Sequence, residues 1–366
     1  MPFAQTSQTS QTSQTSQTSQ TSQTGQTSSL NHAGGVSSTH LSQALNSVSQ
    51  SFSTEAIEDL SNYTPPKGPE QLRRLQPLHL HVLLRDALSR GLLVNKVQNA
   101  AMTIQLDGID LTVQPDDAAS PSVAIADWAP SAADVNRVMD RRWLRAERMN
   151  EIIDQQTDIL SFLALAYPMT RETHPYTMAI LDAVLAAVGK LVVEAKYLLN
   201  VPRPADVVTG VAPVIRTPAH GSMPSGHAAE AWAMAFVMEC MIFGTPCQEL
   251  RLVAARIEEN RIVAGVHYEK DGEVGRLMAI TLAKVMGDRL GLDVTHLGPS
   301  ATWTGAGEAG LRTSGNEGTP HVLVQTNPPR VVEGVLGDIM TLSRLELGLP
   351  AAVNVPGANG AEQNND

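Results

Sequence analysis

Long runs of helical periodicity, with no strands between them, most constrain the fold of this chain. From residue 131 onward, apolar residues recur at spacings of three and four, which is typical of helices that bury one face. No unit of strand followed by helix repeats, so a parallel α/β sheet is disfavoured. The sequence predicts an all-α helical bundle, with helices over 132–166, 173–199, 225–243, 247–265 and 271–290.

One pair of strands is expected before the bundle. The stretch "MTIQLDGIDLTVQP" alternates apolar and polar residues on both sides of Asp107-Gly108. This dipeptide is a two-residue turn signal that is typical of a β-hairpin. We therefore expect a small accessory hairpin near 103–113 that packs on the helical body, and we expect Ser131 and Thr173 to cap the first two helices.

Composition divides the rest of the chain. Residues 5–28 are near-perfect Gln-Thr-Ser triplets, a period that matches neither a helix nor a strand face and is typical of disorder. The predicted organisation is a disordered tail, an accessory region that includes the hairpin, a helical core, a C-terminal extension and a second disordered tail, over 1–50, 51–130, 131–295, 296–348 and 349–366 respectively.

The charge and hydropathy of the sequence restrict the kinds of partner that the protein can bind and its expected location in the cell. A formal net charge of −11 argues against a nucleic-acid partner, because phosphate backbones select a basic face. The N-terminus has neither a basic start nor an apolar run, and no stretch reaches the roughly 18 to 20 uncharged apolar residues of a membrane span. Two cysteines, Cys240 and Cys247, form no disulfide framework. We expect a soluble, cytoplasmic protein with free thiols, and a homodimer is a reasonable expectation for such a bundle.

Two cations follow one another at the end of the second predicted helix. The stretch "KYLLNVPRPAD" places Lys196 and Arg203 seven residues apart. A lysine also suits the negative end of a helix dipole, so Lys196 alone has a purely structural explanation. Arg203 lies between two prolines, which fix the backbone and aim a guanidinium fork suited to two oxygens of an oxyanion. We interpret the pair as anion ligands.

The segment "GSMPSGHAAE" has the composition of an anion cradle. Ser225 can cap the following helix, whose first N–H groups carry a partial positive charge. Gly226 lets a ligand approach the main chain, because no Cβ stands in the way. A serine cap followed by glycine is also common in helices that bind nothing, so the tetrapeptide alone is a weak signal.

A histidine and a carboxylate follow in "NRIVAGVHYEKD". Arg261, His267 and Asp271 are spaced six and four residues apart. A carboxylate one helical turn after the histidine can accept its Nδ1–H, which fixes the tautomer and leaves Nε2 free to attack or to bind. A lone histidine near a glycine often has only a structural role. The spacing between His267 and Asp271 favours a catalytic or ligand-binding role instead.

Together the three blocks resemble the shared signature of a superfamily. Its members are the type 2 phosphatidic acid phosphatases, the bacterial class A acid phosphatases and the vanadium-dependent haloperoxidases. Their pattern is Lys-x6-Arg-Pro, then Pro-Ser-Gly-His, then Ser-Arg-x5-His-x3-Asp. The resemblance covers about residues 130 to 290, and the one departure is Asn260, where the family usually has Ser. It implies a helical bundle of the acid phosphatase/vanadium haloperoxidase type, with the catalytic residues in the core over 131–295.

The resemblance also implies a role for each matching residue. The oxygens of phosphate or vanadate would be held by Lys196, Arg203, Arg261, Ser225 and the N–H of Gly226. His267, partnered by Asp271, would be the axial ligand of vanadate or the nucleophile that becomes phosphohistidine. His227 would be the acid–base residue, a role typically worth about 10²- to 10⁴-fold in rate. One site suits both anions, because trigonal-bipyramidal vanadate resembles the transition state of phosphoryl transfer.

Features outside the signature favour a vanadate-dependent haloperoxidase, which oxidises halide with hydrogen peroxide. The chain most resembles soluble bacterial haloperoxidase-like proteins, because the family's membrane phosphatases span the bilayer and its exported acid phosphatases are shorter. His220 lies seven residues before His227, where bromide- and iodide-oxidising members also carry a histidine. An ordinary loop histidine is the plain explanation of the same residue.

Two alternatives stay open. Val193 stands where eukaryotic haloperoxidases have tryptophan, and "GSMPSGHA" also resembles the acid phosphatase block. A soluble acid phosphatase that hydrolyses phosphate esters through a phosphohistidine, with no cofactor, is therefore the first alternative. The second is a non-catalytic anion-binding or scaffold protein, although binding alone needs no acid–base histidine.

Overall fold

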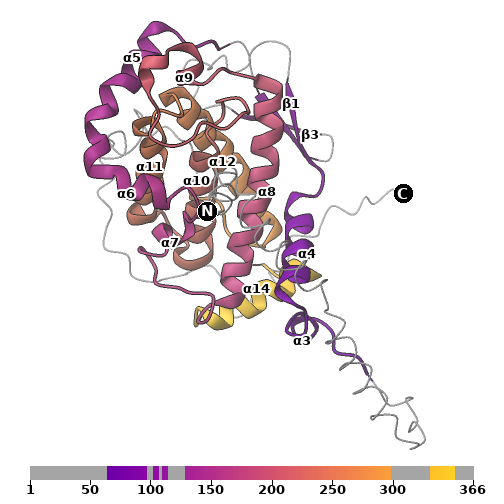
Figure 1. The fold of residues 1–366 in the computed structure, drawn as a ribbon. Coiled ribbons are helices and arrows are strands. Elements are labelled where there is room, and N and C mark those ends of the chain that lie inside the picture. The colour runs from indigo at the N-terminus through magenta and orange to yellow at the C-terminus, as the bar shows by residue number, and fades with distance from the viewer. Residues whose placement is uncertain (1–63, 97–101, 107–108, 114–127, 298–329, 351–366) are drawn as a thin grey trace, which may run out of the picture.

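The computed structural model describes residues 64–96, 102–106, 109–113, 128–297 and 330–350. The predicted tail over 1–50, most of the tail over 349–366 and the Asp107-Gly108 turn lie outside the described residues. Within the described ranges the chain is a helical bundle flanked by three short strands (Figure 1), so the all-α prediction is confirmed.

Four long helices form the body of the bundle. They are α8 (Pro175–Leu199), α10 (Gly226–Met238), α11 (Gln248–Val263) and α12 (Glu269–Arg289), and all four were predicted. Every residue of α10 is buried, because α8, α11 and α12 pack around it. A helix that is apolar on all sides is expected to lie inside a core. The polar groups at its N-terminus are therefore buried with it.

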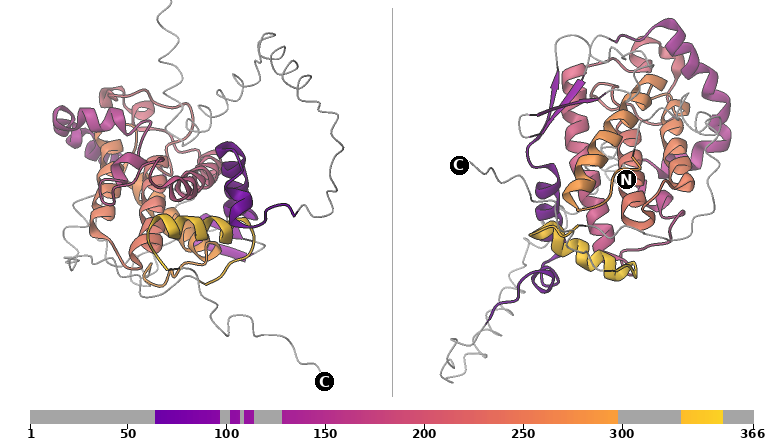
Figure 2. Two further views of the ribbon diagram at one scale, coloured as in Figure 1. Left: turned by 90° about the horizontal axis from the view of Figure 1, so that it is seen from below. Right: turned by 180° about the vertical axis from the view of Figure 1, so that it is seen from behind.

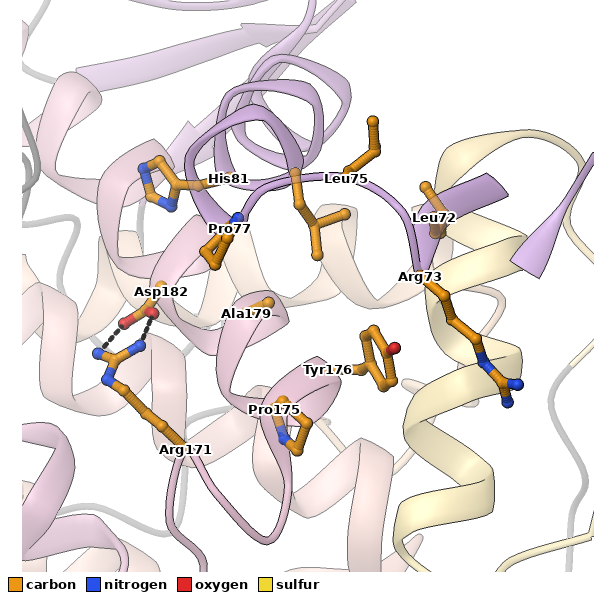
Figure 3. A pocket seen from close by; sticks show the side chains of 11 residues that line it. Leu72, Arg73, Leu75, Pro77, His81, Arg171, Pro175, Tyr176, Ala179 and Asp182 are labelled. Atoms are coloured by element: carbon orange, nitrogen blue, oxygen red, sulfur yellow. Dashed lines mark hydrogen bonds and ion pairs between the residues drawn. The ribbon is translucent and has the colours of Figure 1, made fainter. Parts of the chain in front are cut away.

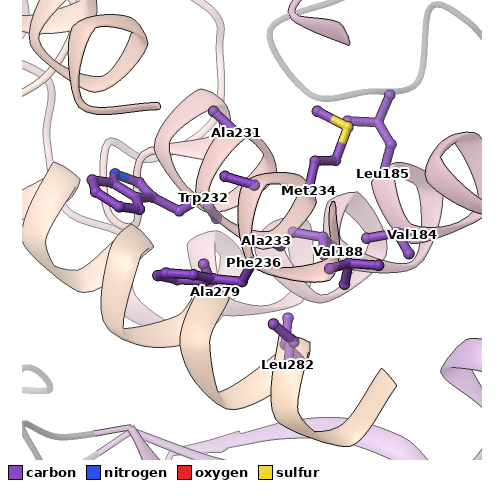
Figure 4. Close-up of a cluster of buried hydrophobic side chains, with 14 of the residues drawn as sticks. Val184, Leu185, Val188, Ala231, Trp232, Ala233, Met234, Phe236, Ala279 and Leu282 are labelled. Carbon is purple, nitrogen blue, oxygen red and sulfur yellow. The ribbon is translucent and has the colours of Figure 1, made fainter. Parts of the chain in front are cut away.

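Small residues let the central helices approach closely. Ala279 of α12 lies beside Phe236 of α10, whose ring centroid is 5.5 Å from that of Trp232 (Figure 4). Nearer the start of α10, Gly275 of α12 lies against the backbone of α10. A Cβ atom at this position would be 2.8 Å from the carbonyl oxygen of Ser225. The crossing of α12 over α10 therefore requires a glycine at this position.

The predicted hairpin is confirmed as part of a three-stranded sheet. Strands β2 (Met102–Leu106) and β3 (Ile109–Val113) pair antiparallel, with Leu106 opposite Ile109. A strand that we did not predict, β1 (Leu92–Lys96), pairs with the other edge of β2. The sheet flanks the bundle (Figure 2), and Lys190 of α8 donates a hydrogen bond to the Leu92 carbonyl at 3.0 Å.

The predicted helix over 132–166 is wrong as a single element. The chain forms α5 (Ala132–Asp140), a 3-10 turn (Arg141–Leu144), α6 (Arg145–Asp154) and α7 (Leu160–Leu163). Tertiary contacts override the periodicity at the first break, since Arg141 pairs with Glu259 and Glu269. At the second break, α6 ends at its cap residue Gln155, which leaves the carbonyl of this residue free for a partner outside the helix.

Two predicted caps have different outcomes. Ser131 caps α5 as predicted, in a reciprocal pair of hydrogen bonds with Asp134. The Thr173 cap is wrong: the residue before α8 is His174, and the first N–H groups of α8 are bound instead by Glu346. Glu346 ends α14 (Val335–Glu346), a helix in the predicted C-terminal extension.

The remaining elements are short or lie at the edge of the bundle. They are α3 (Pro69–Leu72), α4 (Pro77–Ser89), α9 (Pro204–Val207), a 3-10 turn over Thr209–Val211 and a π-turn over Glu239–Phe243 that continues α10. Among the described helices, none has the length and apolar character needed to cross a membrane.

Candidate active site

The three motif blocks converge at one end of the bundle, near α9 and opposite α14 (Figure 1). Lys196 lies in the last turn of α8, and Arg261 lies in the last turn of α11. Arg203 precedes α9, and the loop from there to α10 carries the cradle segment. His267 lies just before α12. The four side chains are at most 3% exposed, so the site is buried.

Two of the cations hold the loop that leads to α10. Lys196 Nζ donates to the carbonyls of Gly221, at 3.2 Å, and Ser222, at 2.9 Å. Arg203 donates from Nε to the His220 carbonyl at 3.0 Å and from Nη1 to the Val266 carbonyl at 2.8 Å. We expected the guanidinium group of Arg203 to face an oxyanion. Two of its three nitrogens, Nε and Nη1, instead donate to backbone carbonyls.

His220 lies beside Arg203, at the rim of the site. Its Nδ1 is 3.2 Å from Arg203 Nη2, and the ring is half-buried. Burial, with Lys196 nearby, lowers the pKa of His220 to about 4. The imidazole is therefore neutral at physiological pH.

His267 is held by a carboxylate, as its spacing predicted. Its Nδ1 lies 3.0 Å from Asp271 Oδ2, which also accepts hydrogen bonds from the Tyr268 N–H at 2.9 Å and from the Ser222 hydroxyl. Burial raises the pKa of Asp271 to about 6, while the Ser222 hydroxyl and the Tyr268 N–H act in the opposite direction. Burial, with Arg203 and Lys196 nearby, keeps the pKa of His267 well below its ordinary value. With Nδ1 occupied, Nε2 is the nitrogen available to a ligand.

Ser225 begins α10 but does not cap it with its side chain. Its N–H donates to the Asp271 carbonyl at 2.8 Å, which ties the start of α10 to α12. Its hydroxyl is buried and has no hydrogen-bond partner among the described residues. The expected cap is therefore absent, and the hydroxyl is left for a ligand, next to Gly226 at the first position of the helix.

Among the described residues, Arg261 has more donors without a partner than Lys196 or Arg203 has. Nη2 donates to the Ile152 carbonyl at 3.1 Å and to Gln155 Oε1 at 3.0 Å. Nε and Nη1 are buried and have no partner among the described residues. Burial lowers the pKa of Arg261 to about 9 and that of Arg203 to about 10, so both stay charged at neutral pH.

His227 points to the end of α6. Its Nε2 lies 3.0 Å from the Gln155 carbonyl, and this partner requires that Nε2 carry the proton. Burial, reinforced by Arg261, keeps the pKa of His227 well below its ordinary value. The ring is therefore neutral, and its Nδ1 keeps a lone pair.

Sequence reasoning missed two residues of this network, Ser222 and Gln155. Ser222 lies three residues before Ser225, in the segment "GSMPSGHAAE". The sequence interpretation of this segment used only the residues from Pro224 onward. Gln155 accepts from Arg261 and Asn260 through its side chain and from His227 through its backbone, and its Nε2 is buried without a partner among the described residues. No motif marks Gln155 in the sequence.

The resulting chemistry suits an oxyanion. The motif blocks bring three buried cations and a buried histidine to one end of the bundle, together with several donors that have no partner among the described residues. Binding a compact anion with many acceptor oxygens would pair these donors and offset the burial of the cations. By contrast, no group of three or more acidic, histidine or cysteine side chains in the described part of the chain could hold a metal cation.

One comparison with known proteins covers the region of this site. Residues 177–287 match the family model described as the PAP2 superfamily. This segment runs from the first turn of α8 into the last turns of α12 and contains every candidate residue from Lys196 to Asp271. No curated protein matches the chain.

Proposed function

We propose that this segment with a PAP2-superfamily match is the catalytic part of a vanadate-dependent haloperoxidase, which oxidises halide with hydrogen peroxide. The proposal rests on four buried donors that have no partner among the described residues: Arg261 Nε and Nη1, the Ser225 hydroxyl and Gln155 Nε2. Arg261 and Ser225 belong to the motif blocks, and Gln155 bonds to both Arg261 and His227. A buried donor without a partner costs about 1 to 3 kcal/mol. Four such donors on residues of the motif blocks and on their direct partner are therefore expected to serve a ligand.

The donor set fits vanadate. Its oxygens would be held by Lys196, Arg203, Arg261, Ser225, the N–H of Gly226 and Gln155, and its vanadium by His267 Nε2. Bound there, vanadate would activate hydrogen peroxide for oxidation of a halide. The chain's own contribution is to neutralise the anion's charge and to keep water away from it.

Asp271 and Ser222 prepare His267 for this role. The carboxylate accepts the Nδ1–H, which fixes the tautomer and presents the Nε2 lone pair. The Ser222 hydroxyl donates to the same oxygen and favours the ionised carboxylate. The positioning of the ligand nitrogen therefore depends on two residues that do not touch the anion themselves.

One observation favours the peroxidase over the acid phosphatase. The site side chains are at most 3% exposed apart from the half-buried His220, and this closure suits small reactants such as peroxide and halide. The hydrogen bond of His227 to the Gln155 carbonyl does not distinguish the two activities, because His227 is the expected acid–base residue of both.

The test is a vanadate titration of the purified full chain, with bromide or iodide oxidation by peroxide and hydrolysis of a chromogenic phosphate ester measured in parallel. Halide oxidation that appears only with vanadate, and that His267→Ala abolishes while His79→Ala does not, is the expected result. His79 is an exposed histidine on α4 and serves as the matched control.

Other outcomes select the alternatives. Ester hydrolysis that is present without vanadate and suppressed by it would identify a phosphatase with the same site residues. Vanadate binding with neither activity would identify a non-catalytic anion-binding protein. The cytoplasmic location and the homodimer stay predictions.

A further inference from the structure

A cavity lies far from the site just described. Its volume is about 290 Å³, and it lies between α3, α4 and the first turns of α8 (Figure 3). Ala179 lines it, whereas Lys196 is seventeen residues further along α8. At roughly 1.5 Å per residue, the two positions are about 25 Å apart along the helix. The cavity is therefore separate from the anion site.

Apolar side chains form most of its wall. Leu72 and Leu75 come from the α3 end, Pro77 and Leu80 come from α4, and Ala179 comes from α8. The aromatic ring of Tyr176 lies at the opposite end of the cavity from His81 (Figure 3). Such a wall selects a ligand that is mainly apolar and small.

The charged groups in the wall already have partners. Arg171 forms two hydrogen bonds with the Asp182 carboxylate, one of them at 3.0 Å from Nη2 to Oδ1. Arg73 pairs with Glu70 at 3.0 Å. The cavity therefore offers no free charge to a ligand among the described residues, and a carboxylate or an ammonium group would gain little there.

His81 is the exception among the polar residues of the wall. It is 7% exposed, and neither Nδ1 nor Nε2 has a hydrogen-bond partner among the described residues. Burial lowers its pKa, so the ring is neutral. A neutral imidazole has one N–H donor and one acceptor nitrogen. A hydroxyl group, which both donates and accepts, matches this chemistry.

We propose that this cavity binds a small apolar molecule with one hydroxyl group, a phenol being the simplest case, and that the hydroxyl hydrogen-bonds to His81. The wall supplies the apolar contacts, and His81 supplies the polar specificity. This site does not depend on the activity proposed above, because no residue is shared between the two.

The experiment is calorimetric titration of the full chain with phenol, without peroxide so that no turnover contributes, and with toluene as the ligand that lacks the hydroxyl. We expect saturable binding of phenol and at least about tenfold weaker binding of toluene, the loss associated with one hydrogen bond. Absence of saturable phenol binding, or equal binding of the two ligands, would overturn the proposal.

Three variants locate the site. His81→Leu should weaken phenol binding by about tenfold or more, and Ala179→Phe should abolish it by filling the cavity. His79→Leu makes the same exchange at an exposed position of α4 and should leave binding unchanged. His81→Leu removes buried nitrogens that have no partner, so it should melt no lower than the parent. Phenol binding that persists in both cavity variants would place the ligand elsewhere and refute the assignment.

Discussion

The side-chain oxygen of Gln155 lies 3.0 Å from Arg261 Nη2, and it also accepts a hydrogen bond from Asn260 Nδ2 at 3.1 Å. Two donors on Oε1 fix the orientation of the amide, because a flip would set its NH₂ group against them. Nε2 must then face away from both donors, where it has no partner among the described residues. Since the backbone oxygen of Gln155 binds His227, one residue orients two members of the site and adds a donor of its own.

Gln155→Leu should weaken vanadate binding by about tenfold or more. The change keeps the approximate size of the side chain but removes the acceptor of Arg261 and one unpaired donor, each worth about 1 kcal/mol. Vanadate affinity, measured calorimetrically, checks this. Gln156→Leu is the control, since the neighbouring amide donates a hydrogen bond to the Ile153 carbonyl and to no site residue among those that the structure describes. An unchanged affinity in Gln155→Leu would remove Gln155 from the site.

Arg261→Lys and Arg203→Lys should have different effects. The Nε and Nη1 donors of Arg261 have no partner among the described residues, so its replacement should weaken vanadate affinity by at least about tenfold. The melting temperature should fall less than in Arg203→Lys, because Arg261 holds one backbone carbonyl, that of Ile152. Arg203 holds the carbonyls of His220 and Val266, so its replacement should lower the melting temperature as well. Thermal melts and vanadate titrations of both variants would show this. Equal melting temperatures would contradict the structural role of Arg203.

Ser222→Ala should move the acid limb of the activity profile to higher pH. The hydroxyl of Ser222 lowers the pKa of Asp271 against the effect of burial, which raises it to about 6. Without the hydroxyl this pKa rises further, so the carboxylate that holds His267 becomes protonated at a higher pH and activity is lost earlier on acidification. A pH profile of vanadate-supported halide oxidation measures the shift. Ser343→Ala, at a buried serine that bonds to Thr177, should leave the profile unchanged.

Glu346→Ala should lower the free energy of unfolding by about 1 to 2 kcal/mol, the usual cost of losing a helix cap. Its carboxylate accepts hydrogen bonds from the N–H groups of Tyr176 and Thr177, both at 2.8 Å. Denaturant unfolding gives the value. Glu333→Ala changes an exposed carboxylate just before α14 and should have almost no effect. A loss as small as that control would mean that α14 contributes little to the start of α8.

The predictable part of the site lies within the motif blocks. Lys196, Arg203 and Arg261 could be found because each has a fixed spacing to chemically informative neighbours, and the structure brings them to the same end of the bundle. The four long helices could be found because their apolar faces meet a single core. Both follow from local patterns in the sequence.

The rest depends on contacts between distant segments. Gln155 enters the site through a carbonyl that is free only because α6 ends there, about forty residues before the first block. Periodicity continues across that break and predicts a helix instead. In the same way, the first turn of α8 is capped by Glu346, a residue 170 positions away from Tyr176, and not by the threonine that precedes it.

Gly275 has a wider consequence for the kinds of change that this protein can tolerate. A single methyl group at this position would lie 2.8 Å from the carbonyl oxygen of Ser225 and would force α12 away from the start of α10. Ser225 and His267, which lie just before the two helices, would then move apart, although neither had been altered. The spacing of the site residues therefore restricts residue 275 to glycine, although this residue is itself no part of the proposed anion site.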